Sequence, residues 1–149
     1  MTNKLTKLMD DKARQNFALA AGTEMHARLK NVFFDANGNA SGDSDIIAKL
    51  SKNKELIEYM GPLSKTEVPI AGYIGGKFKS LRIDRLYINK TNKQIVIIDY
   101  KTDLDKEKFH KEYVAQVKEY HQVLTDAYPD FTIAAKILWL SDFTLENVI

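Results

Sequence analysis

The pattern of hydrophobic and polar positions divides the chain into a helical first part and a second part in which strand-like segments dominate. Before Gly61–Pro62 the apolar residues recur at spacings of three and four, which predicts helices over 4–20, over a stretch after Gly22–Thr23, and from a cap at Ser44 or Asp45 to about Met60. After Gly61–Pro62 the pattern predicts strands over 66–74, 77–88 and 94–100, a helix over about 106–127, and a last strand over 131–140. Residues 35–43 have the composition of a polar loop.

The order of these elements predicts an α/β fold, at the border with α+β, in which helices flank a mixed sheet of about four strands. The pair Gly75–Gly76 suits a tight hairpin between the first two strands, and residues 90–93 join the second strand to the third. The last strand can lie beside 94–100 only through a helical crossover, so these two strands should be parallel. Pro69 favours an edge position for the first strand. We expect residues 1–149 to form a single domain.

The two hairpins align three carboxylates. A symmetric first turn places Glu67 opposite Asp84, and a second turn centred on Thr91–Asn92 places Asp84 opposite Asp99. Lys101 follows Asp99 by two residues and therefore points to the same side of the sheet. Aligned carboxylates repel one another, and a bound divalent cation would compensate for that repulsion. The alternative is a bulge, which would turn the acids to different sides.

The composition limits the chemistry that such a site can hold. The chain of 149 residues is 44% hydrophobic and 28% charged, as is usual for globular proteins, and it contains no cysteine. Without cysteine, disulfide scaffolds, cysteine-bound zinc, iron–sulfur clusters and thiol catalysis are excluded. A metal must then bind oxygen or imidazole ligands, which favours hard ions such as Mg²⁺ or Mn²⁺.

The distribution of charge and apolar residues gives only general expectations about location and partners. No apolar run has the length of a membrane span, and the N-terminus lacks the apolar centre of a signal peptide, so we expect a cytoplasmic protein with no membrane partner. The net charge of +2 is too small to indicate nucleic-acid binding by itself. The lysines between residues 101 and 118 add local positive charge, and a solvated helix face explains them at least as well.

Five short motifs occur in order along the chain: Gly22-Thr-Glu-Met-His26, Glu67-Val-Pro-Ile70, Arg82-Ile-Asp84-Arg-Leu86, Ile98-Asp-Tyr-Lys-Thr102 and Gln116-Val-Lys-Glu-Tyr120. Together they resemble the RecB/AddA-type nuclease domain of bacterial helicase–nucleases. This domain is a branch of the PD-(D/E)XK superfamily, which also includes Cas4-like exonucleases. The resemblance spans residues 22 to 120, and the helix–strand order continues to match through residue 140.

The resemblance implies a role for each matching position. The implied metal ligands for Mg²⁺, which Mn²⁺ would replace, are His26, Asp84, Asp99 and the backbone carbonyl of Tyr100. The implied catalytic residues are Asp84, Asp99 and Lys101. Gln116 and Tyr120 would lie beside the active site and help to position DNA, and Glu67 would have a secondary role.

The implied activity is metal-dependent hydrolysis of phosphodiester bonds in DNA, in recombination, repair or degradation. An exonuclease is favoured over an endonuclease. The implied partners are DNA, with single-stranded DNA as one candidate, and a helicase subunit. The chain has no Walker motif, so the expectation is a stand-alone nuclease or an excised domain. It also lacks the cysteines that frame an iron–sulfur cluster in some relatives.

Other interpretations of the same residues stay open. The chain could be a catalytically inactive nucleic-acid-binding or interaction module of the same fold, or a hydrolase of small phosphoesters, although it has no phosphate-binding loop. His26 could be a hydrogen-bonded core residue. Gln116 and Tyr120 could be an amphipathic pair on a helix, and Lys101 a surface ion-pair partner. An exposed edge strand leaves dimerisation open.

Overall fold

A computed structural model describes Lys4, Met9, residues 22–102 and residues 106–149. The helix predicted over 4–20 lies almost wholly outside the described residues. The main sheet has five strands: β3 (Ser64–Ile74), β4 (Lys77–Asn89), β5 (Gln94–Lys101), β6 (Thr132–Trp139) and β7 (Thr144–Asn147). The described helices are a segment over residues 22–30, α2 (Ser44–Leu50), α3 (Lys54–Tyr59) and α4 (Lys106–Ala127). A second, two-stranded sheet pairs β1 (Phe33–Phe34) with β2 (Ala40–Ser41).

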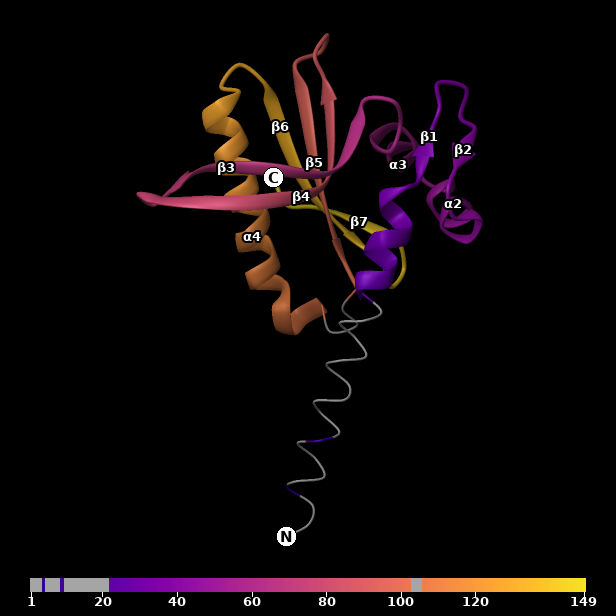
Figure 1. The fold of residues 1–149 in the computed structure, drawn as a ribbon, viewed down its shortest axis with the longest axis horizontal. Coiled ribbons are helices and arrows are strands. Elements are labelled where there is room, and N and C mark those ends of the chain that lie inside the picture. Colours follow the sequence, from indigo (N-terminus) through magenta and orange to yellow (C-terminus); the bar gives the residue numbers. More distant parts are fainter. Residues whose placement is uncertain (1–3, 5–8, 10–21, 103–105) are drawn as a thin grey trace.

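The main sheet confirms the predicted mixed topology. Its strand order is β3-β4-β5-β6-β7, so β3 is at one edge, as its proline indicated. The β3–β4 and β4–β5 pairs are antiparallel, whereas β5 and β6 are parallel and are joined through α4 (Figure 1). The fifth strand, β7, was not predicted, because a segment of four residues gives too short a pattern to distinguish from a loop.

The structure corrects the prediction of one helix running from Ser44 or Asp45 to Met60. Two short helices occupy this stretch, and Asp43 caps the first of them by accepting a hydrogen bond from the Ile46 N–H. Asn53 caps the second by accepting from the Glu55 N–H. Asn competes with helical backbone through such side-chain bonds, so it divides a stretch whose apolar spacing alone looks continuous. The predicted loop over 35–43 contains the turn of the β1–β2 hairpin and the strand β2.

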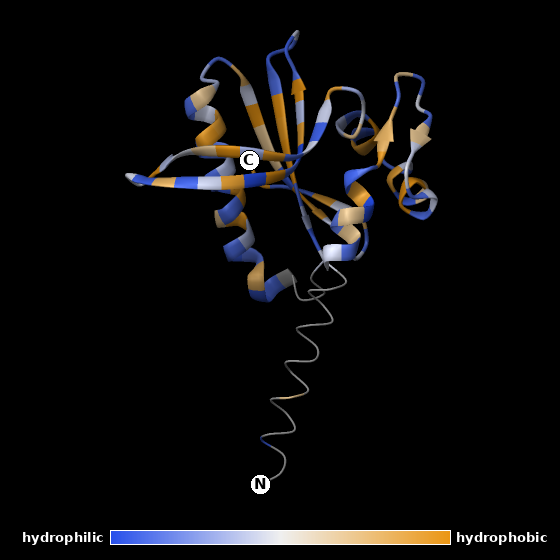
Figure 2. Cartoon of the chain, in the orientation of Figure 1, coloured by the Kyte–Doolittle hydropathy of each residue, from blue (hydrophilic) through white to orange (hydrophobic). Residues whose placement is uncertain are grey.

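The main sheet is covered on both faces. The helical segment 22–30, α2 and α3 cover one face, and α4 covers the other (Figures 1 and 2). Apolar side chains of β5 alternate between these two cores, as expected for a strand buried on both sides. No helix among the described residues is both long and apolar enough to cross a membrane.

The β3–β4 hairpin changes its orientation halfway along its length. All the paired residues keep the register set by the Gly75–Gly76 turn, but the ladder omits Glu67 and Asp84, and Glu67 has a positive φ of 51°. Ile83 packs in the core beneath α4, whereas Arg85, only two residues later, contacts the opposite layer. Side chains two residues apart normally share a face, so the strand inverts at Asp84. The outer half of the hairpin therefore runs across the other strands (Figure 1).

Candidate metal-dependent active site

Asp84 and Asp99 lie where β4 and β5 separate. The last pair of the β4–β5 ladder is Arg85 opposite Ile98, in the register that the symmetric turn predicted, and Asp84 and Asp99 are the next residues beyond its end. There the Asp84 side chain takes the place of a backbone acceptor: its Oδ2 accepts a hydrogen bond of 2.8 Å from the Tyr100 N–H. The strand inversion therefore brings a carboxylate to the point where a backbone hydrogen bond would otherwise form.

Asp99 is a buried carboxyl group with an unsatisfied oxygen. Its exposure is 3%, and its Oδ2 makes no hydrogen bond to any described residue. The Lys101 Nζ is 3.0 Å from this oxygen, but its direction is outside hydrogen-bonding geometry. Burial raises the pKa of Asp99 to about 7, and the nearby Asp84 charge adds to the increase while Lys101 opposes it.

His26 approaches Asp84 from the helical segment 22–30. Its Nδ1 is 2.7 Å from the Gly22 carbonyl oxygen, which can only accept, so Nδ1 carries a proton and Nε2 faces Asp84 Oδ2 at 3.3 Å. The hydrogen bond to Asp84 raises the pKa of His26, although burial opposes this. Burial also pushes the pKa of Asp84 upward, but the bonds from His26 and Tyr100 outweigh it and leave that pKa lowered. His26 is thus a paired imidazole at the site and not a core residue.

Lys101 is held by side chains of α4. Its Nζ donates a 2.9 Å hydrogen bond to Gln116 Oε1 and lies 4.6 Å from the centre of the Tyr113 ring. With the Asp99 contact, three groups fix the ammonium, whose side chain is 19% exposed. Gln116 therefore orients the lysine in this structure, and Tyr113, which sequence reasoning treated as packing, completes its surroundings.

Glu67 does not join the row of three carboxylates that the hairpins predicted. The ladder skips it because of its left-handed backbone, and its carboxylate lies 3.7 Å from Lys30 Nζ. Tyr120 does lie near the site, since the charges of Asp99 and Asp84 add to the raising of its pKa by burial. It is only 4% exposed, so the described structure gives it little access to DNA.

The Tyr100 carbonyl is directed toward the same site. The Lys101 carbonyl accepts from the Leu140 N–H, on the β6 side of β5. Carbonyls of successive strand residues point to opposite sides, so the Tyr100 carbonyl points to the β4 side, where Asp84 binds its N–H. This orientation agrees with the ligand role that the family resemblance implied for it.

The donor set fits a divalent metal, although it is not a ready-made cage. Two carboxylates, an imidazole nitrogen and a carbonyl oxygen are ligands that Mg²⁺ or Mn²⁺ accepts, and the buried Oδ2 of Asp99, which contacts the Lys101 ammonium but makes no hydrogen bond, is free to bind a second cation. No three His, Asp or Glu side chains of the described segments are arranged as a preformed metal cluster. The ion pairs His26–Asp84 and Asp99–Lys101 explain this, because each ligand is turned toward a positive side chain.

Arg85 is the residue of this region whose role sequence reasoning missed. Its guanidinium is fully buried, donates to the carbonyls of Leu29 and Val32 at 2.9 and 2.8 Å, and donates to the Tyr100 hydroxyl at 2.9 Å. It also lies 4.7 Å from the Phe33 ring centre. These contacts connect the end of the helical segment that carries His26 to the strands that carry the acids. An arginine between buried strand residues was the only sequence signal.

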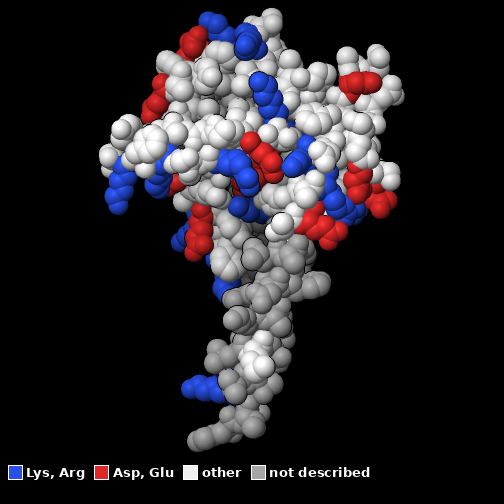
Figure 3. All heavy atoms as spheres, viewed as in Figure 1, with Lys and Arg blue, Asp and Glu red and all other residues white. Residues whose placement is uncertain are grey.

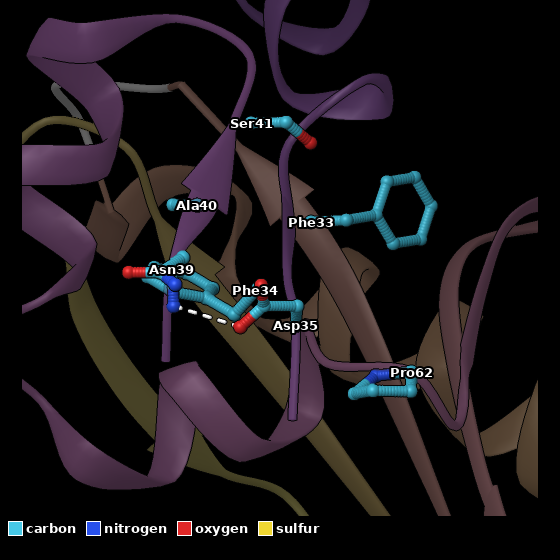
Figure 4. A pocket seen from close by; sticks show the side chains of 7 residues that line it. All are labelled: Phe33, Phe34, Asp35, Asn39, Ala40, Ser41 and Pro62. Atoms are coloured by element: carbon cyan, nitrogen blue, oxygen red, sulfur yellow. Dashed lines mark hydrogen bonds between the residues drawn. The ribbon is translucent and has the colours of Figure 1, made fainter. Parts of the chain in front are cut away.

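A separate hollow beside the β1–β2 hairpin offers no comparable chemistry. Its walls are Phe33, Phe34, Asp35, Asn39, Ala40, Ser41 and Pro62 (Figure 4). The Asp35 carboxylate is already used by the turn, where it accepts from the backbone N–H groups of Asn37 and Asn39. No residue of the acidic site lines this hollow.

Comparison with protein-family models finds no match, and no curated protein matches the sequence. Among solved structures, the crystal structure of SSO0001 aligns with 98% of this chain at a TM-score of 0.45 and 16% sequence identity. This chain spans 59% of the length of that chain. At this level of similarity, only the residues of the site itself can support a function.

Proposed function

We propose that this chain is a metal-dependent DNA nuclease of the PD-(D/E)XK type, similar to the RecB/AddA nuclease domain. The observation that carries the proposal is the buried, unbonded oxygen of Asp99, placed beside Asp84 and 3.0 Å from the ammonium of Lys101. Burying a carboxylate oxygen that makes no hydrogen bond costs free energy. In a site that binds a cation and a phosphate, this oxygen would be a ligand of the cation.

The proposed metal ligands are Asp84, Asp99, the Nε2 of His26 and the Tyr100 carbonyl. A bound Mg²⁺ would polarise the phosphodiester and lower the pKa of a coordinated water. The Nδ1–H of His26 is held by the Gly22 carbonyl, which fixes the ring so that its other nitrogen is available as a ligand. Asp84 is likewise oriented by the Tyr100 N–H.

Lys101 is the group that we assign to the reacting phosphate. Its position among Asp99, Gln116 and Tyr113 holds the ammonium without hiding it, and its positive charge suits the extra negative charge of the transition state. We therefore assign it electrostatic stabilisation of the transition state rather than a general-base role. Gln116 keeps the lysine in place.

The narrower parts of the proposal follow from the family resemblance. They are an exonuclease activity on DNA, a role in recombination, repair or degradation, and association with a helicase subunit. The crossover of β5, α4 and β6 beside a β3–β4 hairpin that carries Asp84 supports the PD-(D/E)XK assignment, because it groups Asp84, Asp99 and Lys101 at one end of the sheet.

The test is cleavage of end-labelled single- and double-stranded DNA with Mg²⁺, with Mn²⁺ and with EDTA. We expect cleavage that needs a divalent ion and that falls by at least about 10²-fold in Asp99→Ala and in Lys101→Ala. Lys90→Ala is the matched control, since Lys90 is an exposed lysine in the β4–β5 turn and should retain full activity.

Two results would contradict the proposal. Cleavage that survives both substitutions would place the activity elsewhere or in a contaminant. DNA binding without cleavage in either metal would instead support the non-catalytic module.

A further inference from the structure

The outer half of the β3–β4 hairpin is basic and carries an exposed aromatic pair. Residues 68–83 contain three basic side chains, Lys77, Lys79 and Arg82, and no Asp or Glu. Tyr73 and Phe78 lie opposite each other near the tip and are 68% and 63% exposed. Their rings meet edge to face, with 5.5 Å between their centres. Adjacent exposed aromatic rings bordered by polar residues are typical of surfaces that bind a ligand.

The two faces of this half-hairpin differ in what covers them. One face packs on α4: a side chain at Gly72 would meet Val123, and Lys79 forms a 2.6 Å ion pair with Glu119. The other face, which we call the open face, alternates with it along both strands. It consists of Pro69, Ala71 and Tyr73 on β3 and Phe78, Ser80 and Arg82 on β4.

The open face leads from the aromatic pair to the acidic site. Phe78, Ser80 and Arg82 occupy alternate positions of β4, and beyond Arg82 the strand reaches Asp84, where it inverts. Phe78 and Asp84 are six positions apart along the strand, a distance of roughly 20 Å at about 3.3 Å per residue, or about six stacked nucleotides. Basic side chains border the hairpin tip at the left of Figure 3.

We propose that the open face binds single-stranded DNA beside the cleavage site, with an unpaired base stacked on Tyr73 and Phe78 and a backbone phosphate on Arg82. The inference rests on the proposed function for its choice of ligand. A single strand exposes its base faces to aromatic side chains, whereas a duplex does not. A second copy of the chain is disfavoured as the occupant, because two hairpins of the same positive charge repel each other.

The experiment measures binding in EDTA, so that it does not depend on cleavage. The probes are fluorescein-labelled dT18, an abasic 18-mer with the same phosphates, and an 18-bp duplex, followed by fluorescence anisotropy. We expect the double variant Tyr73→Ala/Phe78→Ala to bind dT18 about tenfold more weakly than the wild-type chain does, and to bind the abasic strand equally well. Arg82→Ala should weaken both strands and lower the salt dependence of binding.

The matched control is Tyr128→Ala, which removes another exposed aromatic ring, 42% exposed, just after the C-terminal end of α4 and outside the open face. It should bind all three probes like the wild-type chain. Since Tyr73 and Phe78 are exposed, the double variant should fold, and unchanged thermal unfolding will confirm this. A dT18 in which one base is 2-aminopurine supplies a direct stacking signal, because stacking on the rings quenches its fluorescence.

Three outcomes would overturn the inference: equal affinity of the double variant and the wild-type chain for dT18, an equal loss on the abasic strand, or a self-association that the double variant abolishes. Cleavage activity together with any of these removes the inference and leaves the nuclease proposal intact. Hairpin-dependent binding of dT18 by a chain that cleaves nothing would support the inference and contradict the nuclease proposal.

Discussion

At the scale of single residues, the two carboxylates of the site differ in their hydrogen bonding. Asp84 accepts from the Tyr100 N–H and faces His26, whereas Asp99 is buried with an unbonded oxygen. The different surroundings move their pKa values in opposite directions: the pKa of Asp84 is lowered and that of Asp99 is raised to about 7. The metal-free protein at neutral pH is therefore balanced between a protonated and an ionised Asp99.

This balance predicts how metal affinity depends on pH. A metal must displace the proton of Asp99 and that of His26, whose pKa is also raised. From Asp99 alone, Mn²⁺ should bind about tenfold more tightly at pH 8 than at pH 6, because the ionised fraction rises about tenfold. Isothermal titration calorimetry will measure this. In Asp99→Asn the pH dependence should shrink, and an unchanged dependence would contradict the assignment.

Asp99 should also weaken the metal-free fold at neutral pH. The folded state binds its proton more tightly than the unfolded state, so stability from this group falls as pH rises from about 4 to about 7. Asp99→Asn should therefore raise the free energy of unfolding by about 1–3 kcal/mol at pH 8 in EDTA, with little effect at pH 4. Urea denaturation at the two pH values tests this. A loss of stability at pH 8 would show that the carboxylate is stabilising.

Gln116 and Lys101 give a graded prediction for catalysis. Lys101→Met removes the charge and should reduce single-turnover cleavage by at least about 10²-fold, while Gln116→Ala only loosens the lysine and should cost about tenfold. Metal affinity should persist in both variants, because neither residue is a proposed ligand. If Gln116→Ala were as inactive as Lys101→Met, Gln116 would contact the substrate itself.

At the scale of elements, the helical segment 22–30 must be held against the sheet for His26 to reach Asp84. Arg85 makes this connection through the carbonyls of Leu29 and Val32 and the Tyr100 hydroxyl. In the described structure no carboxylate binds the Arg85 guanidinium. Its positive charge is instead stabilised by backbone carbonyls at the end of the helical segment and by the Phe33 ring. The arginine thus connects three elements at once.

Removing Arg85 should therefore destabilise the fold strongly. Arg85→Ala leaves a cavity and buried acceptors without donors, which should cost about 3–4 kcal/mol in the free energy of unfolding. Arg82→Ala is the matched control on the same strand and should change it by less than about 0.5 kcal/mol, because Arg82 is exposed. Both values come from urea denaturation. Similar values for the two variants would show that the buried contacts contribute little.

The cap of α2 gives a smaller effect. Asp43 accepts from the Ile46 N–H and pairs with Arg28 at 2.8 Å, and the bond from Arg28 holds the pKa of Asp43 below its ordinary value. Asp43→Ala should lower the melting temperature measurably, and Asp45→Ala, two residues further along, should lower it much less. The difference should diminish as acid protonates Asp43. Thermal unfolding at pH 7 and pH 3 will show whether it does.

At the scale of the whole molecule, the site lies where the two layers meet. His26 comes from the helical layer over one face of the sheet, and Gln116 of α4, on the other face, holds Lys101. The two acids lie between these layers, where β4 and β5 separate. Ligands from separate elements couple metal binding to the stability of the whole fold. The exposed hairpin extends from this centre and enlarges the surface available to a polymer substrate.

Metal addition should therefore stabilise the entire chain. Mn²⁺ at about 100 times its dissociation constant should add about 2.7 kcal/mol to the free energy of unfolding and raise the Tm. The increase should vanish in the double variant Asp84→Ala/Asp99→Ala and persist in Lys90→Ala. Differential scanning calorimetry measures the shift. An equal shift in the double variant would locate the ion elsewhere.

The sequence by itself determined the elements and the register of the strands. The β3–β5 boundaries, the α4 helix and the parallel β5–β6 pair follow from local periodicity, from the Gly75–Gly76 turn and from the handedness of a crossover. The β4–β5 register, which ends next to Asp84 and Asp99, followed by counting from the turns. Such features depend on neighbours close in sequence, and a short pattern therefore specifies them. The break at Asn53 and the four residues of β7 were too local or too short to predict.

Only the tertiary structure decided how the site is assembled. The left-handed backbone at Glu67 inverts the hairpin, which separates Glu67 from the other two acids. The pairing of His26 with Asp84, the hold of Gln116 on Lys101 and the contacts of Arg85 join elements 15 to 58 positions apart in the chain. These contacts arise when layers pack, because packing alone determines which distant side chains meet, and no local pattern encodes that choice.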